Sequence, residues 1–129
     1  MIAVWVEQNL NPCHKRVGDC SIRAIANALG TDWEKAYCIL AAKGYSACDV
    51  MNADSVIGSV LKDCNFKRSV IPNSCSDCFT ADDFCKEQKN GVYVLFFGGH
   101  VACVRDGLLL DTWDSSQEIP QYYWAKEER

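Results

Sequence analysis

Residues 17–30 read VGDCSIRAIANALG, and this stretch carries the clearest structural signal in the chain. Its apolar side chains recur at helical spacing, which predicts a helix over 20–29. Asp19 is a favourable residue to cap the start of that helix, and Gly30 suits its end. Cys20 then stands in the first turn, where free backbone N–H groups and the helix dipole stabilise an anion. A cysteine in that position is suited to ionise and act as a nucleophile, although a small buried core residue is the alternative.

The composition is that of one soluble globular domain over residues 1–129. Thirteen basic and 17 acidic residues give a net charge of −4 without a basic patch, so we expect no nucleic-acid partner. No apolar run approaches the roughly 18 residues of a membrane-spanning helix, and the N-terminus does not resemble a signal peptide. We therefore expect a cytoplasmic protein with no membrane partner and no cofactor, and the sequence leaves its oligomeric state open.

Nine cysteines without a secretion signal indicate reduced thiols rather than a disulfide framework. Cys38, Cys64 and Cys103 fall at apolar positions of periodic segments, where cysteine behaves as a small core residue.

The segment CSDCFTADDFC, residues 75–85, offers a different use of cysteine. Cys75, Cys78 and Cys85 could bind zinc, with Cys64 as a further ligand, which would make the chain a small zinc-binding protein. A second matched CxxC pair, typical of structural zinc sites, is missing from the sequence, so we expect no metal.

The order of the remaining elements predicts the fold class. Helical patterns precede three β-rich runs that are separated by turn residues, which indicates an α+β fold with a C-terminal antiparallel sheet. The C-terminal aromatic segment QYYWAKEER is expected to pack Trp124 on the sheet, or else to present its aromatic side chains to a partner. The expected helices cover 31–44, 53–63 and a short segment from residue 80, and the expected strands cover 2–6, 68–71, 92–98, 100–104 and 108–113.

A nucleophilic cysteine usually needs a base, and the chain contains only two histidines, His14 and His100. His14 lies in the loop before the first helix. His100 follows two glycines and opens a predicted strand, a place where glycine often marks close approach of backbone or ligand. A histidine packed in the core is the alternative interpretation of His100.

The dipeptide Asp106-Gly107 predicts a two-residue hairpin turn. In that register, residues two apart along a strand and residues paired across it share a face, so Asp111 lies diagonally across from His100. Asp114 points to the opposite face, and a one-residue slip of register would exchange the two carboxylates.

The stretches VGDCSIRAIANALG and GGHVACVRDGLLLDTWDS, residues 98–115, together resemble the papain-like cysteine peptidase superfamily. The nearest likeness is to small papain-like proteins of bacteria and their phages that have no characterised activity. The resemblance covers residues 17–45 and 92–114 well and the middle of the chain hardly at all. It implies a papain-like fold, with N-terminal helices and the nucleophile at a helix start packed on the sheet.

The resemblance also implies a thiol hydrolase or acyltransferase that cleaves an amide, isopeptide or thioester bond of a peptide or protein substrate. Its catalytic triad would be Cys20, His100 and Asp111. Papain relatives usually place a glutamine six residues before the cysteine, where it helps to bind the oxyanion. This chain has His14 there, and Asn11 is the other candidate donor. A papain-like module that binds a partner without catalysis is the remaining alternative.

Overall fold

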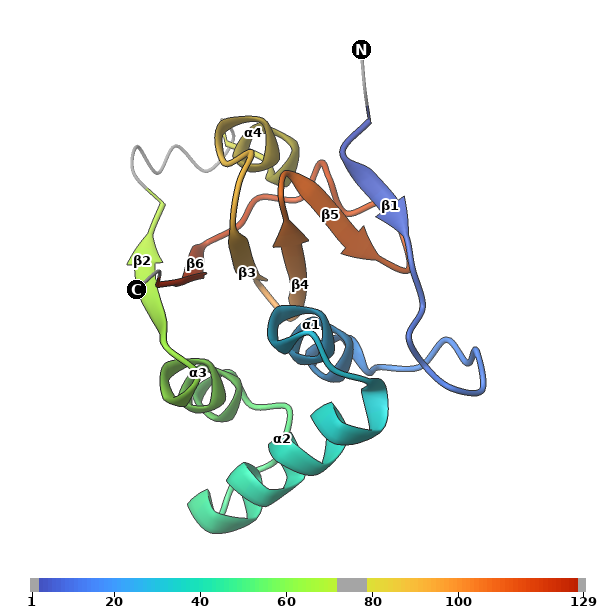
Figure 1. Cartoon of the computed structure of the whole chain (residues 1–129), viewed down its shortest axis with the longest axis vertical. Coiled ribbons are helices and arrows are strands. Elements are labelled where there is room, and N and C mark those ends of the chain that lie inside the picture. The colour runs from blue at the N-terminus through green and yellow to red at the C-terminus, as the bar shows by residue number, and fades with distance from the viewer. Residues whose placement is uncertain (1–2, 72–78, 128–129) are drawn as a thin grey trace.

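The structure is a computed structural model that describes residues 3–71 and 79–127. Within these residues the chain forms an α+β fold in which four helices cover a six-stranded sheet (Figure 1). The elements in chain order are β1 (Trp5–Glu7), α1 (Cys20–Leu29), α2 (Trp33–Ala47), α3 (Asp54–Asp63), β2 (Phe66–Val70), α4 (Ala81–Glu87), β3 (Val92–Phe97), β4 (His100–Arg105), β5 (Leu108–Asp111) and β6 (Tyr122–Lys126).

The sheet is mixed rather than antiparallel, which corrects one part of the sequence prediction. Its strand order is β1-β5-β4-β3-β6-β2, and β1 runs parallel to β5 while the other neighbours are antiparallel. The aromatic C-terminal segment forms β6, which lies between β3 and β2. In the segment QYYWAKEER, apolar and polar residues alternate only weakly. The sequence therefore contains no local signal for its pairing with two distant strands.

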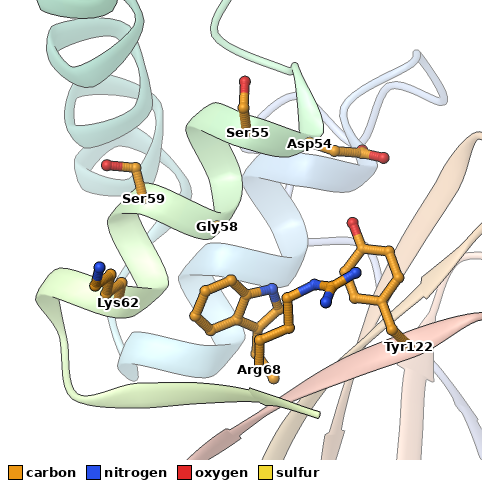
Figure 2. Close-up of a pocket in the computed structure, with 8 residues that line it drawn as sticks. Asp54, Ser55, Gly58, Ser59, Lys62, Arg68 and Tyr122 are labelled. Carbon is orange, nitrogen blue, oxygen red and sulfur yellow. The ribbon is translucent and has the colours of Figure 1, made fainter. Parts of the chain in front are cut away.

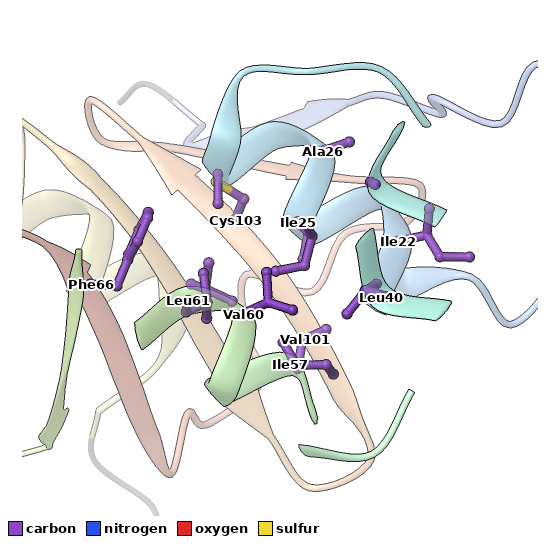
Figure 3. Packing of buried hydrophobic residues seen from close by; sticks show 14 of the residues in the cluster. Ile22, Ile25, Ala26, Leu40, Ile57, Val60, Leu61, Phe66, Val101 and Cys103 are labelled. Carbon is purple, nitrogen blue, oxygen red and sulfur yellow. The ribbon is translucent and has the colours of Figure 1, made fainter. Parts of the chain in front are cut away.

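The two faces of the sheet carry separate hydrophobic clusters, because successive residues of a strand point to opposite faces. In β3, Val94 and Phe96 pack toward α1, α2 and α3, whereas Leu95 and Phe97 pack toward α4. Figure 1 shows α4 across the sheet from the other three helices. The cluster under α1 is shown in Figure 3, where the labelled residues include Ile22, Ile25, Leu40, Ile57, Val60, Leu61, Val101 and Cys103.

Helix α1 has the predicted bounds and ends at Gly30 in the left-handed conformation, with φ +66°. It is buried nearly all round, from Ser21 to Ala28, because the sheet, α2 and α3 pack against it on different sides. The N-terminal end of this helix is therefore held firmly against β4.

Helix α2 continues past Gly44, which we predicted as its end, to Ala47. Gly44 allows close packing instead: a Cβ there would lie 3.0 Å from the carbonyl oxygen of Asp49. Only one stripe of α2 is buried, so Cys38 is exposed on its solvent side and is not a core residue as predicted. Cys64 is half-buried and Cys103 is fully buried.

None of the helices in the described part of the chain has the length and apolar character needed to cross a membrane.

Candidate functional site

Cys20 is the first residue of α1, and its side chain is half-buried beside the start of β4. The His100 ring and the backbone N–H of Val101 both act on this thiol and lower its pKa. Helix α1 packs directly on β4, which brings the helix start to these two strand residues. The structure therefore joins the predicted nucleophile to the predicted base.

His100 follows the tight turn formed by Gly98 and Gly99 and is paired with Phe97 at the end of β3. Gly99 adopts φ +84°, a conformation that side-chain-bearing residues rarely take, so a glycine suits this turn. The Nε2 atom of His100 lies 2.7 Å from Oδ2 of Asp111. Because Nε2 faces the carboxylate, Nδ1 is the ring nitrogen left for Cys20.

The hairpin register is confirmed where both strands are paired: Arg105 lies opposite Leu108, and Cys103 lies opposite Leu110. This register places Asp111 on the His100 side, as predicted. Asp114 is exposed and accepts a hydrogen bond from the backbone N–H of Ser116, away from the ring.

The Asp111 carboxylate is buried, with 1% of the residue exposed. Besides His100, it accepts hydrogen bonds from the Ser115 hydroxyl at 2.7 Å and from the Thr112 backbone N–H at 2.8 Å. Burial alone would raise the pKa of this carboxyl, but the His100 and Ser115 hydrogen bonds hold it below its usual range. Asp111 is thus a charged group with a fixed orientation.

The electrostatics of the site favour a thiolate facing an imidazolium. Burial opposes charge on both groups, yet the hydrogen bonds from His100 and Val101 lower the pKa of the Cys20 thiol below its ordinary value. Hydrogen bonds with Asp111 and Cys20 raise the pKa of His100 to about 9. At neutral pH the ring therefore carries a proton that it can donate to a leaving group.

Two aromatic rings flank His100. The Phe97 ring stacks at 5.7 Å between centroids, and the Trp113 ring lies at 5.1 Å with an angle of 45°. These rings limit rotation of the imidazole and keep its Nε2 edge toward Asp111.

Arg23 connects the site to a second buried carboxylate, and the sequence analysis missed it. Its Nε atom donates to Asp19 at 2.9 Å and its Nη1 atom donates to Asp111 at 3.2 Å. Only 8% of the Arg23 side chain is exposed. The i,i+4 spacing of Asp19 and Arg23, and a charge within an apolar helix, were the available signals.

Asp19 precedes α1 but does not cap it with its side chain, which corrects the sequence expectation. Its carboxylate instead accepts hydrogen bonds from Arg23, from the Trp33 indole at 3.0 Å and from the Asn11 amide at 3.3 Å. The backbone N–H groups of the first turn, including that of Cys20, therefore have no side-chain cap and remain suited to an anion.

A pocket of about 200 Å³ opens onto the cysteine. It is lined by residues from the start of α1, the start of α3 and the β3–β4 turn, namely Gly18, Cys20, Ser21, Asn52, Asp54, Ile57, Gly99, His100 and Val101.

Neither predicted oxyanion donor lines this pocket. His14 is exposed in the preceding loop, and the Asn11 side chain donates to Asp19 while its oxygen accepts from the backbone of Cys13 and Lys15. Asn11 thus shapes the loop, and the side-chain amide on the pocket wall belongs to Asn52.

The zinc alternative lies mostly outside the described residues, because Cys75 and Cys78 do. Cys85 belongs to α4 and is buried in the hydrophobic cluster between this helix and the sheet. Burial raises the pKa of its thiol to about 12. Within residues 3–71 and 79–127, no group of three His, Cys, Asp or Glu side chains is placed to hold a metal ion.

The chain matches no protein family model, and searches among curated proteins and among solved structures also found no match.

Proposed function

We propose that this protein is a cysteine-dependent hydrolase or acyltransferase that acts on an amide, isopeptide or thioester bond of a peptide or protein. Cys20 is the nucleophile, His100 carries the proton, and Asp111 holds the imidazole in place. The observation that carries the proposal is the grouping of Cys20 with His100 at one pocket, with the His100 ring hydrogen-bonded to the buried Asp111 at 2.7 Å.

We also propose that the fold is papain-like. In support, the nucleophile begins a helix that packs on the sheet, while the histidine and the acid lie on the neighbouring strands β4 and β5. The order cysteine, histidine, aspartate along the chain agrees with the sequence resemblance described above.

In the first step, the Cys20 thiolate attacks the carbonyl carbon, and the electron pair of the C=O bond moves to the oxygen. We assign the developing oxyanion to two donors on residues that line the pocket, the backbone N–H of Cys20 and the side-chain amide of Asn52. As the oxyanion collapses, the bond to the leaving nitrogen or sulfur breaks and His100 gives that atom its proton. An acyl group remains on the Cys20 sulfur.

In the second step, neutral His100 takes a proton from water or from an acceptor amine as that molecule attacks the acyl carbon. The bond between the acyl carbon and the Cys20 sulfur breaks, and the sulfur leaves as a thiolate. The thiolate and imidazolium are restored, so no further reactant is needed.

A model thioester tests this proposal. We expect a peptide alkyl thioester to acylate Cys20 and then to be hydrolysed, with the acyl group found on Cys20 by mass spectrometry of the trapped protein. The rate should rise at a pH below the ordinary thiol range, because the thiol pKa is lowered. With an amide in place of the thioester, the rate should fall above about pH 9, because His100 then loses the proton that the leaving amine needs.

The matched control is the Cys20→Ala variant, which should lack both the acyl adduct and turnover while remaining folded. If wild type and Cys20→Ala hydrolyse the thioester at the same rate, the proposed catalysis is wrong. A papain-like module that binds a partner without catalysis then becomes the better interpretation.

A further inference from the structure

A second cavity lies along α3 and adjoins the Cys20 pocket. Its volume is about 320 Å³, and its walls come from α3, β2 and β6: Asp54, Ser55, Gly58, Ser59, Lys62, Arg68, Tyr122 and Trp124 (Figure 2). Asp54 borders both cavities. A chain bound at Cys20 and continuing along α3 would therefore enter this cavity.

Two basic side chains line the cavity, Lys62 from α3 and Arg68 from β2. Lys62 and Arg68 are both exposed and form no ion pair with any other residue that the structure describes. The Arg68 guanidinium lies 4.1 Å from the centre of the Tyr122 ring, which orients it while leaving N–H groups for a ligand. Figure 2 shows this guanidinium against the ring.

An acidic side chain, Asp54, lies where the cavity adjoins the Cys20 pocket. Figure 2 shows the Tyr122 hydroxyl pointing toward Asp54. Burial and the charge of Asp54 raise the pKa of Tyr122, which places the carboxylate near that hydroxyl. Asp54 therefore opposes a ligand carboxylate at the end of the cavity next to Cys20. Lys62, farther along α3, and Arg68 over the Tyr122 ring attract one.

Gly58 allows the Trp124 indole, which forms one wall of the cavity, to approach α3 closely. A Cβ at this position would lie 2.9 Å from Cζ2 of Trp124, so a larger residue would push the indole away from α3 and toward the cavity. With glycine, the indole and the Tyr122 ring form an apolar wall beside the two cations.

We infer that this cavity is a substrate subsite that selects a peptide carrying an acidic side chain a few residues from the bond that Cys20 attacks. The inference rests on the proposed function and names the substrate class of that site. Asp54 and Lys62 are eight residues apart on α3, which is about 12 Å along a helix. An extended peptide advances roughly 3.3 Å per residue, so about three to four residues of a bound peptide span the distance from Asp54 to Lys62.

The test uses peptides blocked at both ends whose central residue carries a chloroacetamide, an electrophile that the Cys20 thiolate alkylates with loss of chloride. A single glutamate is moved one position at a time along each side of the centre, and a glutamine peptide is the reference at each position. We expect glutamate at one such position to speed Cys20 alkylation about two- to fivefold, the scale of an exposed ion pair. The preference should weaken at high salt.

Arg68→Gln and Lys62→Gln should each reduce this preference, and the double variant should abolish it. Lys67→Gln is the matched control: it removes the same charge from the same strand, and Lys67 does not line the cavity. Equal rates for glutamate and glutamine at every position, or a preference that survives the double variant, would overturn the subsite.

Alkylation by iodoacetamide separates this failure from failure of the proposed function. A Cys20 that reacts quickly with iodoacetamide in all variants but shows no glutamate preference overturns the subsite alone. A Cys20 that does not react with iodoacetamide overturns the proposed function, and the subsite with it.

Discussion

Replacing Arg23 with glutamine is expected to lower the free energy of unfolding by about 3–5 kcal/mol, the cost of breaking a buried charge network by removing one partner. Arg23 lies between Asp19 and Asp111, whose side chains are 4% and 0% exposed. Without the guanidinium, the negative charges of Asp19 and Asp111 remain buried and lose the positive charge that pairs with both. Chemical denaturation at neutral pH measures the change.

Arg16→Gln is the matched control for that variant. Arg16 bonds to Glu7 and to the Thr112 carbonyl oxygen, but the two charged side chains are 62% and 59% exposed. An exposed pair contributes about 0–1 kcal/mol, so this variant should be nearly as stable as wild type. Equal losses in the two variants would mean that Arg23 does not stabilise the buried carboxylates as described.

Replacing His100 with alanine is expected to lower thioester turnover by about 10²- to 10⁴-fold, the usual contribution of a positioned acid–base group. The variant loses the imidazole that lowers the pKa of the Cys20 thiol, and it loses the base that takes a proton from the attacking water. Steady-state hydrolysis near pH 7 measures the loss.

His14→Ala is the natural comparison, because these are the two histidines of the chain. His14 is exposed and does not line the Cys20 pocket, so its loss should leave turnover within about twofold of wild type, as is usual for a surface position away from special features. A large loss in His14→Ala with little change in His100→Ala would reverse the assignment of the base.

The parts of this site that could be predicted from the sequence are those with local signals. Helix α1 could be placed from its apolar spacing and from Gly30, and Asp111 could be distinguished from Asp114 because Asp106-Gly107 determines the hairpin register. In each case the information lies within about a dozen residues of sequence.

What escaped prediction depends on contacts between distant segments. The Asp19 carboxylate turns away from the helix start because Arg23, Trp33 and Asn11 converge on it, and nothing at Asp19 itself signals that convergence. The parallel pairing of β1 with β5 likewise joins residues about a hundred positions apart. Local propensity carries no information about such pairings.

The central claim is that Cys20 is an activated nucleophile, and competition among the thiols for a limiting amount of iodoacetamide tests it most directly. The labelled positions are identified by peptide mass spectrometry after brief reaction near pH 6. We predict that Cys20 is labelled first, ahead of the exposed Cys13, Cys38 and Cys48, because its thiol pKa is lowered although it is only half-exposed. Preferential labelling of any other cysteine, with Cys20 left unmodified in the folded protein, would contradict the account.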